Sequence, residues 1–253
     1  MNRVEKAKHF AELHVAGRPL LLYNAWDAGS AKAILEAGAK AIATSSWSVA
    51  AANGFQDGER IPLDLAINNL RRIVSAVEVP VTVDLESGYG DVPDAVGMTI
   101  GMAIEVGAAG CNLEDSFPAN GELRKPSDQV DRIACARQVA EEANIRFFIN
   151  VRTDVFFQRS AEHHDNTMLE DAIERARLYA AAGADGVFVP GLVDIHLIRR
   201  LAEASRLPVN VMVVDERPSV SILAQNGVAR VSCGPRPYLL AMKALEEATR
   251  AAV

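Results

Sequence analysis

Two carboxylates follow a short apolar segment at residues 79–87, which reads VPVTVDLES. The β-branched residues indicate a buried strand, and the Gly-Tyr-Gly tripeptide after it indicates the turn that ends the strand. Because side chains alternate along a strand, Asp84 and Glu86 are predicted to share one face at its carboxyl end. Two neighbouring carboxylates repel each other unless a cation or hydrogen-bond donors compensate their charge. The pair therefore indicates a site that receives positive charge.

Polar residues also follow the other apolar segments of the chain. Strand alternation pairs Asn112 with Glu114, and Asn150 with Arg152. Carboxylates from adjacent strands suit a hard cation such as Mg²⁺, for which Mn²⁺ could substitute. The Arg152 guanidinium could bind a carboxylate or a phosphonate through two hydrogen bonds. The residues predicted at the strand ends are Asn24, Trp26, Asp27, Thr44, Ser45, Ser46, Trp47, Asp84, Glu86, Asn112, Glu114, Asp115, Asn150, Arg152, Asp154 and Asn210.

Each of these residues also has an ordinary structural interpretation. Asp27 could cap the helix that follows it, and Asp115 could support a neighbouring side chain. Arg152 could form a simple ion pair with Asp154. Acids on two adjacent strands, followed by an arginine on the next, favour a joint metal and anion site over these separate explanations.

Two long connections could border such a site. Residues 117–126, FPANGELRKP, form a candidate gating loop that carries Arg124 and Lys125, although a solvated connector would read the same way. In residues 49–62, Asp57 could point toward the site or form a local turn before the next glycine. The adjacent histidines at 163–164 lie in a polar stretch and are predicted to be solvated.

Recurring patterns show how these residues are positioned. A glycine precedes an apolar run four times, a proline does so three times, and helical patterns fill the intervals. One domain over 1–253, a (β/α)8 barrel of the TIM type, is therefore predicted, with its chemistry at the carboxyl ends of the strands. The strands are predicted to begin near residues 20, 40, 80, 110, 147, 186, 209 and 229. The helices are predicted within 1–17 and at 29–37, 63–77, 94–106, 127–143, 168–182, 194–205, 219–225 and 238–251.

Composition excludes several classes of protein. The net charge is −7, from 26 basic and 33 acidic residues, without a basic stripe that would bind nucleic acid. No apolar run approaches the roughly 20 residues of a membrane span, and the N-terminus is too polar for a signal peptide. Three cysteines without a paired spacing are typical of a reducing compartment. We therefore expect a cytoplasmic enzyme without nucleic-acid or membrane partners.

Taken together, these motifs resemble the isocitrate lyase and phosphoenolpyruvate mutase superfamily over nearly the whole chain. The resemblance implies a barrel that binds Mg²⁺ and a small anionic keto or hydroxy acid, or a phosphonate analogue. It also implies cleavage or rearrangement of a C–C or C–P bond through an enolate-like species, in a homo-oligomer that often exchanges its last helix. The matching segments are NAWDAGSA (24–31), TSSWSVAAANGFQDGE (44–59), VDLESGYGD (83–91), NLEDS (112–116) and NVRTD (150–154).

The resemblance also implies roles for residues that match the family motifs. The backbone of Ser46 and Trp47 would form an oxyanion pocket with Ser45 beside it, and Asp57 would face the ligand. The implied metal ligands, direct or through water, are Asp84, Glu86 and Glu114. The implied substrate-binding residues are Trp26, Ser46, Trp47, Asp84, Arg152 and Asn210, and the catalytic residues are Ser45, Asp57 and Arg152.

Two departures from the family pattern shape the predicted reaction. Lyases of the superfamily carry a Lys-(Lys/Arg)-Cys-Gly-His segment after the fourth strand, where this chain has FPANGELRKP, and the usual Asp-x-Asp is here Asp84-x-Glu86. Decarboxylation of an oxaloacetate-type acid is favoured, because CO2 leaves without a proton donor. The alternatives are C–P cleavage or rearrangement of phosphonopyruvate, and a barrel that binds a keto acid without turnover. A barrel for phosphorylated sugars is disfavoured, because the acidic residues 214–217 follow strand seven where a glycine-rich turn is expected.

Overall fold

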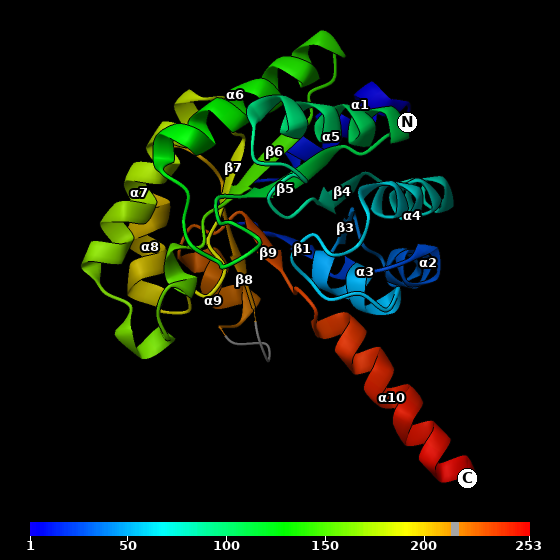
Figure 1. The fold of residues 1–253 in the computed structure, drawn as a ribbon. Helices are drawn as coiled ribbons and strands as arrows, with labels where there is room; N and C mark the ends of the chain where they lie inside the picture. Colours follow the sequence, from blue (N-terminus) through cyan, green and yellow to red (C-terminus); the bar gives the residue numbers. More distant parts are fainter. Residues whose placement is uncertain (214–217) are drawn as a thin grey trace.

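The computed structural model describes residues 1–213 and 218–253, and a barrel of parallel strands forms its centre (Figure 1). The pairings run in the order β1-β9-β8-β7-β6-β5-β4-β3-β2. β1 pairs with β9 and β2 pairs with β3, so these two short strands share one position and close the barrel. The (β/α)8 prediction is thereby confirmed. The strands are β1 Leu20–Leu22, β2 Asn24–Ala25, β3 Ile42–Thr44, β4 Val81–Asp84, β5 Gly110–Glu114, β6 Phe148–Arg152, β7 Gly186–Phe188, β8 Val209–Met212 and β9 Arg230–Ser232.

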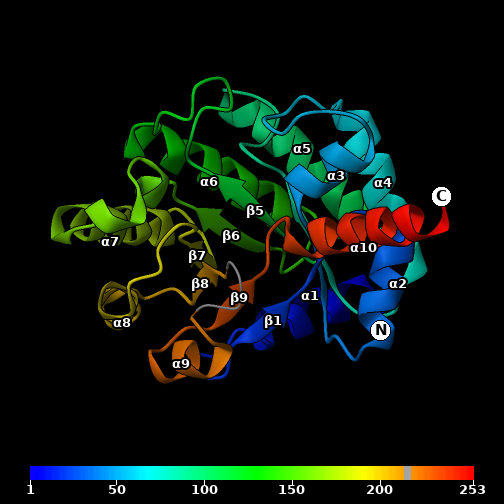
Figure 2. The same ribbon diagram turned by 90° about the horizontal axis from the view of Figure 1, so that it is seen from below.

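Helices surround the strands, and local sequence explains several of their ends (Figure 2). The Asp27 carboxylate accepts a hydrogen bond from the Ser30 amide at 2.7 Å, which confirms it as a helix cap. Gly107 follows a helix with φ +104°, a conformation that favours glycine. The helices are α1 Arg3–Glu12, α2 Ala28–Glu36, α3 Ser46–Ala52, α4 Leu63–Ala76, α5 Pro93–Val106, α6 Pro126–Glu142, α7 Asn166–Ala181, α8 Ile195–Ala204, α9 Val220–Gln225 and α10 Arg236–Ala252, with 3-10 turns η1 Val155–Phe157 and η2 Ala161–His163.

The amino end of the barrel is filled by aromatic side chains. Phe10, from α1, packs edge-on against Phe148 of β6, and the His14 ring stacks on Phe148 with centroids 4.0 Å apart. Gly110 makes room for this group, because a Cβ there would lie 2.5 Å from the Phe148 carbonyl oxygen. The His14 Nδ1 atom lies 2.8 Å from the Phe10 carbonyl oxygen. This packing leaves the carboxyl ends of the strands as the open end of the barrel.

The last helix does not return along the barrel wall. α10 projects away from the other elements (Figure 1). Several large apolar side chains on it are exposed, among them Leu239, Leu240 and Leu245. None of the helices in the described part of the chain is long and apolar enough to cross a membrane.

Candidate active site

Asp84 ends β4 at the mouth of the barrel and is held by two neighbouring segments. Its amide donates to Thr44 Oγ1 at 2.9 Å, and its Oδ2 accepts from the Ser46 amide at 3.1 Å. Ser46 begins α3, so this amide is one of the donors that the helix itself leaves unsatisfied. Asp84 is half-buried, and its carboxylate is thus oriented by backbone before any ligand binds.

Glu86 reaches the mouth by a different route from the one that strand alternation predicts. β4 ends at Asp84, and Glu86 adopts a left-handed conformation with φ +51°. Its Oε2 accepts from the amides of Gly58 and Glu59 at 2.7 and 2.6 Å, while its Oε1 is buried and has no partner among the described residues. Burial, followed by the nearby Asp57 carboxylate, raises the pKa of Glu86 to about 8. Glu86 therefore lies near Asp84, but the prediction that strand alternation positions it is wrong, because its direction is set by the turn after β4.

A second carboxylate completes a reciprocal link between two loops. Glu59 Oε1 accepts from the Ser87 hydroxyl at 2.7 Å and from the Tyr89 amide at 2.8 Å. Glu86 and Glu59 thus each bind the backbone of the segment that carries the other. Arg132, from α6, holds the same turn by donating to the carbonyls of Ser87, Gly90 and Asp91.

Glu114 and Arg152 face each other across β5 and β6, which are paired at these two residues. Arg152 Nη1 lies 2.7 Å from Glu114 Oε2, and its Nε lies 2.6 Å from Asp154 Oδ1. Burial raises the pKa of Glu114 well above its usual value, although Arg152 opposes this shift. Burial would lower the pKa of Arg152, but its two carboxylate partners raise it overall. Arg152 is therefore a charged group that pairs with both Glu114 and Asp154. The predicted ion pair with Asp154 is confirmed.

A buried network behind this pair supports it. Asp115 is fully buried and accepts from the Tyr179 hydroxyl at 2.8 Å and from Arg175 at 3.1 Å. Its other oxygen accepts from the Asp154 amide at 3.0 Å. The interpretation of Asp115 as a supporting residue is confirmed.

The remaining predicted residues occupy several positions around the mouth. Asp57 is exposed at the rim, and partial desolvation with the Asp84 carboxylate raises its pKa, while Ser46 and Arg152 favour its ionised form. The Ser45 hydroxyl accepts from the Ser48 amide at 3.4 Å and caps α3. The rings of Trp26 and Trp47 each form a T-shaped contact with the Tyr238 ring, with centroids 5.2 and 6.0 Å apart.

Asn210 lies inside the barrel, where it is 1% exposed. Its Oδ1 accepts from Asn150 at 3.1 Å, and Asn150 also donates to Asn112 at 2.9 Å. Arg230 of β9 donates to the same Asn112 oxygen at 3.1 Å. Sequence analysis missed Arg230, although an arginine in the apolar run GVARVSCG was a visible signal.

The connection 117–126 is anchored beside the mouth. Arg124 is 3% exposed, pairs with Asp91 at 2.7 Å, and lies over the Phe117 ring at 4.0 Å. Its amide also donates to the Asp115 carbonyl at 2.7 Å. The expectation that Arg124 carries a mobile charge is therefore wrong. The loop does approach residues 49–62, since a Cβ on Gly58 would lie 3.3 Å from the Pro118 carbonyl oxygen.

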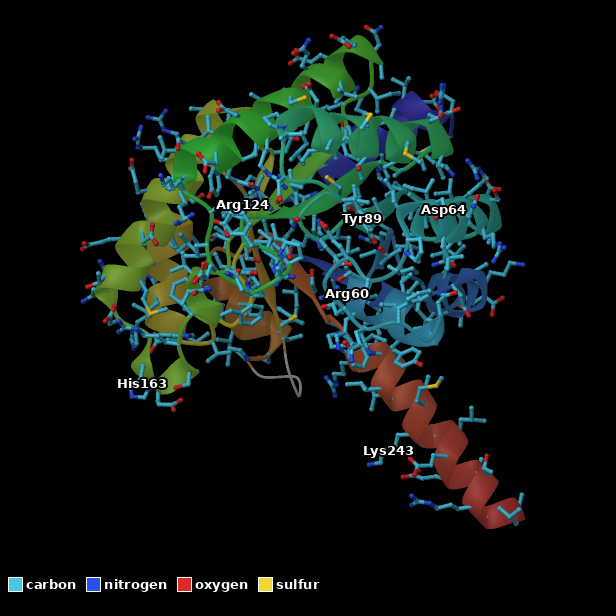
Figure 3. All side chains as sticks on the ribbon, viewed as in Figure 1. Arg60, Asp64, Tyr89, Arg124, His163 and Lys243 are labelled. Atoms are coloured by element: carbon cyan, nitrogen blue, oxygen red, sulfur yellow. The ribbon has the colours of Figure 1, made fainter. Side chains whose placement is uncertain are left out.

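Two predicted features lie away from this cluster. Figure 3 places His163 near the end of the 3-10 turn η2, far from Tyr89 and Arg124. His163 is exposed, but His164 is half-buried with Nε2 2.8 Å from the Phe156 carbonyl oxygen, so the prediction that both are solvated is wrong for His164. Residues 214–217, which counted against a phosphate site, lie outside the described residues.

The donor set at the mouth fits a hard divalent cation. Among the described residues, no three His, Cys, Asp or Glu side chains already form a ligand cluster. Mg²⁺ does not require one, because it usually keeps several waters and binds through one or two carboxylates. The buried Glu86 Oε1 without a partner and the half-buried Asp84 offer oxygen ligands of the right kind.

Residues 10–253 match the sequence profile described as phosphoenolpyruvate phosphomutase. An uncharacterised protein of Mycobacterium tuberculosis strain H37Rv is 38% identical over 245 residues, which cover 96% of this chain and 88% of that protein. A 2-methylisocitrate lyase of Salmonella typhimurium strain LT2 is 30% identical over 199 residues, covering 76% of this chain and 64% of the lyase. A crystal structure from Burkholderia cenocepacia J2315, provisionally described as a phosphonomutase, is 56% identical, covers 100% of both chains and has a TM-score of 0.97.

Proposed function

This chain belongs to the phosphoenolpyruvate phosphomutase family, and from that premise we propose that it is a Mg²⁺-dependent lyase for a small α-keto or 2-hydroxy acid. The favoured reaction is decarboxylation of an oxaloacetate-type substrate through an enolate-like intermediate. The observation that carries this proposal is the group of carboxylates at the ends of β4 and β5, two of them with raised pKa values, beside the Arg152 guanidinium. Such a group gains stability when a cation binds.

Some residues at the mouth would bind the cation, and others would bind the substrate acid. Asp84 would bind Mg²⁺, or Mn²⁺ in its place, with Glu86 and Glu114 as direct ligands or as partners of its water ligands. When bound, the ion would supply Lewis-acid polarisation of the substrate oxygens. Trp47 would offer its backbone amide to the developing oxyanion, while the Ser46 amide, which donates to Asp84, would orient that ligand, with Ser45 fixing the start of α3.

The anionic group of the substrate would bind at Arg152, whose orientation Glu114 and Asp154 set. Asp57 and Trp26 would face the ligand from the rim. Asn210 is engaged inside the barrel, so we propose that it supports the floor of the site. The loop 117–126 would cover the site through its exposed residues 119–122, beyond the anchored Arg124.

Decarboxylation fits the groups that this mouth supplies. Neither cysteine nor histidine occurs in FPANGELRKP, so that loop provides no thiol or imidazole to act as a general acid. Loss of CO2 does not need a proton donor for the leaving group, and water can protonate the resulting enolate.

A second reaction has support from one comparison. The Burkholderia cenocepacia structure with 56% identity is provisionally described as a phosphonomutase. Cleavage or rearrangement of a C–P bond in phosphonopyruvate would use the same cation and the same arginine. This reaction is therefore our second candidate.

We also propose a homo-oligomer in which α10 packs on another subunit. A groove of about 1020 Å³ lies between α2 and α9 and is lined by Leu20 and Leu21 of β1 and by Tyr23, which follows that strand. In a closed (β/α)8 barrel the helix after β9 would cover this position, but α10 projects away from it. We place the enzyme in the cytoplasm, since its three cysteines form no disulfide among the described residues.

The proposed function is tested with a substrate panel and two variants. Oxaloacetate, phosphonopyruvate, 2-methylisocitrate and 2,3-dimethylmalate are incubated with protein and Mg²⁺, and NMR follows substrate loss and pyruvate release. We expect metal-dependent turnover of oxaloacetate, and a rise in Tm with Mg²⁺ and oxalate that Asp84→Ala abolishes while keeping the fold. Asp64→Ala, on the exposed side of α4, is the matched control and should behave as the parent. Parent-like stabilisation of Asp84→Ala by Mg²⁺ and oxalate would refute the site, and turnover of phosphonopyruvate alone would select the second reaction.

A further inference from the structure

Arg230 carries a buried charge inside the barrel. It is 1% exposed on β9, and its Nη2 donates to Asn112 Oδ1 at 3.1 Å. Its Nε and Nη1 are buried and have no hydrogen-bond partner within residues 1–213 and 218–253. Among the same residues, no carboxylate forms an ion pair with it. Of the other buried arginines described above, Arg124 and Arg175 each have a carboxylate partner, and Arg132 donates to three backbone carbonyls.

An unpaired guanidinium in this position is costly to the fold. Burial lowers the pKa of Arg230 to about 10, with Asp84 opposing the shift, so the group is still charged near neutral pH. A buried charge without a partner destabilises a protein, and apolar replacements of similar volume are often more stable. The charge of Arg230 also affects His14: burial of the imidazole, together with the positive charge of Arg230, lowers the pKa of His14 to about 3. The surroundings described so far do not compensate the charge of Arg230.

The barrel brings this charge directly beneath the candidate site. Asn112, which Arg230 contacts, is the strand partner of Asp84 and lies two residues before Glu114 on β5. The same Asn112 oxygen accepts from Asn150, two residues before Arg152 on β6. The Asn112 side chain therefore lies between the Arg230 guanidinium and the strand ends that carry Asp84 and Glu114.

We propose that Arg230 is a positioning residue whose charge favours dianionic over monoanionic ligands at the mouth. It fixes the Asn112 side chain and adds a permanent positive potential from below. This inference rests on the proposed function, in which the mouth binds a small anionic acid with Mg²⁺. A dianion such as oxalate gains about twice as much from this charge as a monoanion such as pyruvate. The charge also opposes binding of Mg²⁺ alone, so Arg230 acts oppositely on the cation and on the acid.

A purely structural role for Arg230 predicts different results from an electrostatic role. If the side chain mainly stabilises the barrel, its removal lowers Tm and changes the affinity for every ligand in the same direction. If its charge serves the ligand, Arg230→Met raises the Tm of the ligand-free protein, because Asn112 Oδ1 still accepts from Asn150. Weaker binding of the acid combined with a higher Tm is thus specific to the proposed role.

The test compares Arg230→Met, Arg230→Gln and Arg230→Lys with the parent protein by thermal unfolding and calorimetric titration. At saturating Mg²⁺, we expect Arg230→Met to weaken oxalate binding about tenfold and pyruvate binding about threefold. Mg²⁺ alone should bind Arg230→Met severalfold more tightly than the parent. Arg230→Gln keeps a donor for Asn112 without the charge and should show the same oxalate loss, which covers the case in which the methionine variant does not fold. Arg230→Lys keeps the charge and should stay within about threefold of the parent for oxalate.

Arg137→Met is the matched control, because Arg137 pairs with Asp185 at the amino end of β7. This control should lower Tm and leave oxalate affinity unchanged. Unchanged oxalate affinity in Arg230→Gln, or equal losses for oxalate and pyruvate, would overturn the inference while leaving the proposed function intact. If the parent protein bound neither Mg²⁺ nor oxalate, both would be wrong.

Discussion

At the scale of single residues, the mouth of the barrel uses carboxylates to fix loops as well as to offer charge. Glu59, Glu86 and Tyr89 adopt positive φ angles of 58°, 51° and 57°, which are uncommon for residues with side chains. Each such conformation costs on the order of 1–3 kcal/mol and persists only where surrounding contacts impose it. Here the imposing contacts are the hydrogen bonds from Gly58 and Glu59 to Glu86, and from Ser87 and Tyr89 to Glu59.

Asp154 is predicted to matter through Arg152. Its carboxylate holds the guanidinium at 2.6 and 3.0 Å and itself accepts from the Ser116 hydroxyl at 2.6 Å. Asp154→Asn removes the charge but keeps the shape, so Arg152 should lose its fixed orientation. We expect oxalate affinity at saturating Mg²⁺ to fall about 10-fold to 100-fold, measured by titration calorimetry. A variant that binds oxalate as tightly as the parent would show that Glu114 alone orients Arg152.

His14 is predicted to control the acid stability of the fold. Burial, with Arg230 contributing, lowers the pKa of His14 from 6.5 to about 3, so the native state keeps it neutral while the unfolded state binds a proton. Its stabilising contribution is fully present above pH 6.5 and is lost as pH falls from 6.5 toward 3. The slope reaches about 1.4 kcal/mol per pH unit for one proton.

His14→Phe keeps a ring that can stack on Phe148 and removes the titrating group. Urea unfolding of the parent should show stability falling between pH 6 and pH 4, and the variant should lose part of that dependence. Equal pH dependence in the two proteins would mean that carboxylates alone determine the acid stability.

Residue types at strand ends could be predicted from sequence, but their contacts could not. Asp84 and Glu114 lie where alternation and barrel topology place them, because both are the last residues of their strands. Glu86 lies beyond the strand, where a turn stabilised by distant amides sets its direction. Arg230 was missed because the sequence does not show whether a charged side chain in an apolar run has a partner.

At the scale of elements, α6 holds the turn that follows β4. Arg132 is fully buried in α6 and donates to three carbonyls between Ser87 and Asp91 and to Gln129. These carbonyls belong to the turn that carries Glu86, so α6 directly holds the segment of a proposed metal-binding carboxylate. Burial lowers the pKa of Arg132 to about 10, and the group remains charged at neutral pH.

Arg132→Met should therefore affect both stability and ligand binding. Leaving these carbonyls without a donor is expected to destabilise the fold by about 3 kcal/mol and to weaken Mg²⁺-dependent oxalate binding. Urea unfolding and calorimetry measure the two effects. Arg177→Met, at an exposed pair on α7, is the control and should change neither quantity. Loss of stability with unchanged oxalate affinity would show that the turn keeps its shape without Arg132.

The repeating sequence patterns predicted the regular strands and helices of the barrel, but not the additional helix α3 or the division of the first strand. Every predicted strand is present, and each except β6 follows a helix-ending glycine or a proline that the chain repeats. α3 was missed, since residues 46–52, SWSVAAA, have little amphipathic pattern, and its start depends on the Ser45 cap. The first strand is divided into β1 and β2, which face different neighbours.

At the scale of the whole molecule, the barrel leaves an apolar surface uncovered. The groove between α2 and α9 is lined largely by apolar or small side chains, including Leu21, Ile34 and Ala224. On α10, Leu239 and Leu245 are 49% and 61% exposed. Exposed apolar patches of this kind are typical of interaction sites. In a symmetric dimer, α10 of each subunit could pack in the groove of the other subunit, so that both apolar surfaces would be covered.

If α10 is exchanged between subunits, substitutions on α10 or in the groove between α2 and α9 should disrupt the oligomer. Leu239→Glu with Leu245→Glu changes the helix, and Ala33→Arg places a long charged side chain in the groove while keeping a good helix-forming residue in α2. Light scattering coupled to size exclusion should show an oligomer for the parent and a smaller species for each variant. Lys243→Ala, on an exposed side of the same helix, is the control and should assemble as the parent does. Tyr238, at the start of α10, contacts both Trp26 and Trp47 at the mouth, so loss of assembly should also weaken oxalate binding by freeing this helix. If the helix variants were monomeric while Ala33→Arg assembled normally, α10 would pack on a surface other than this groove.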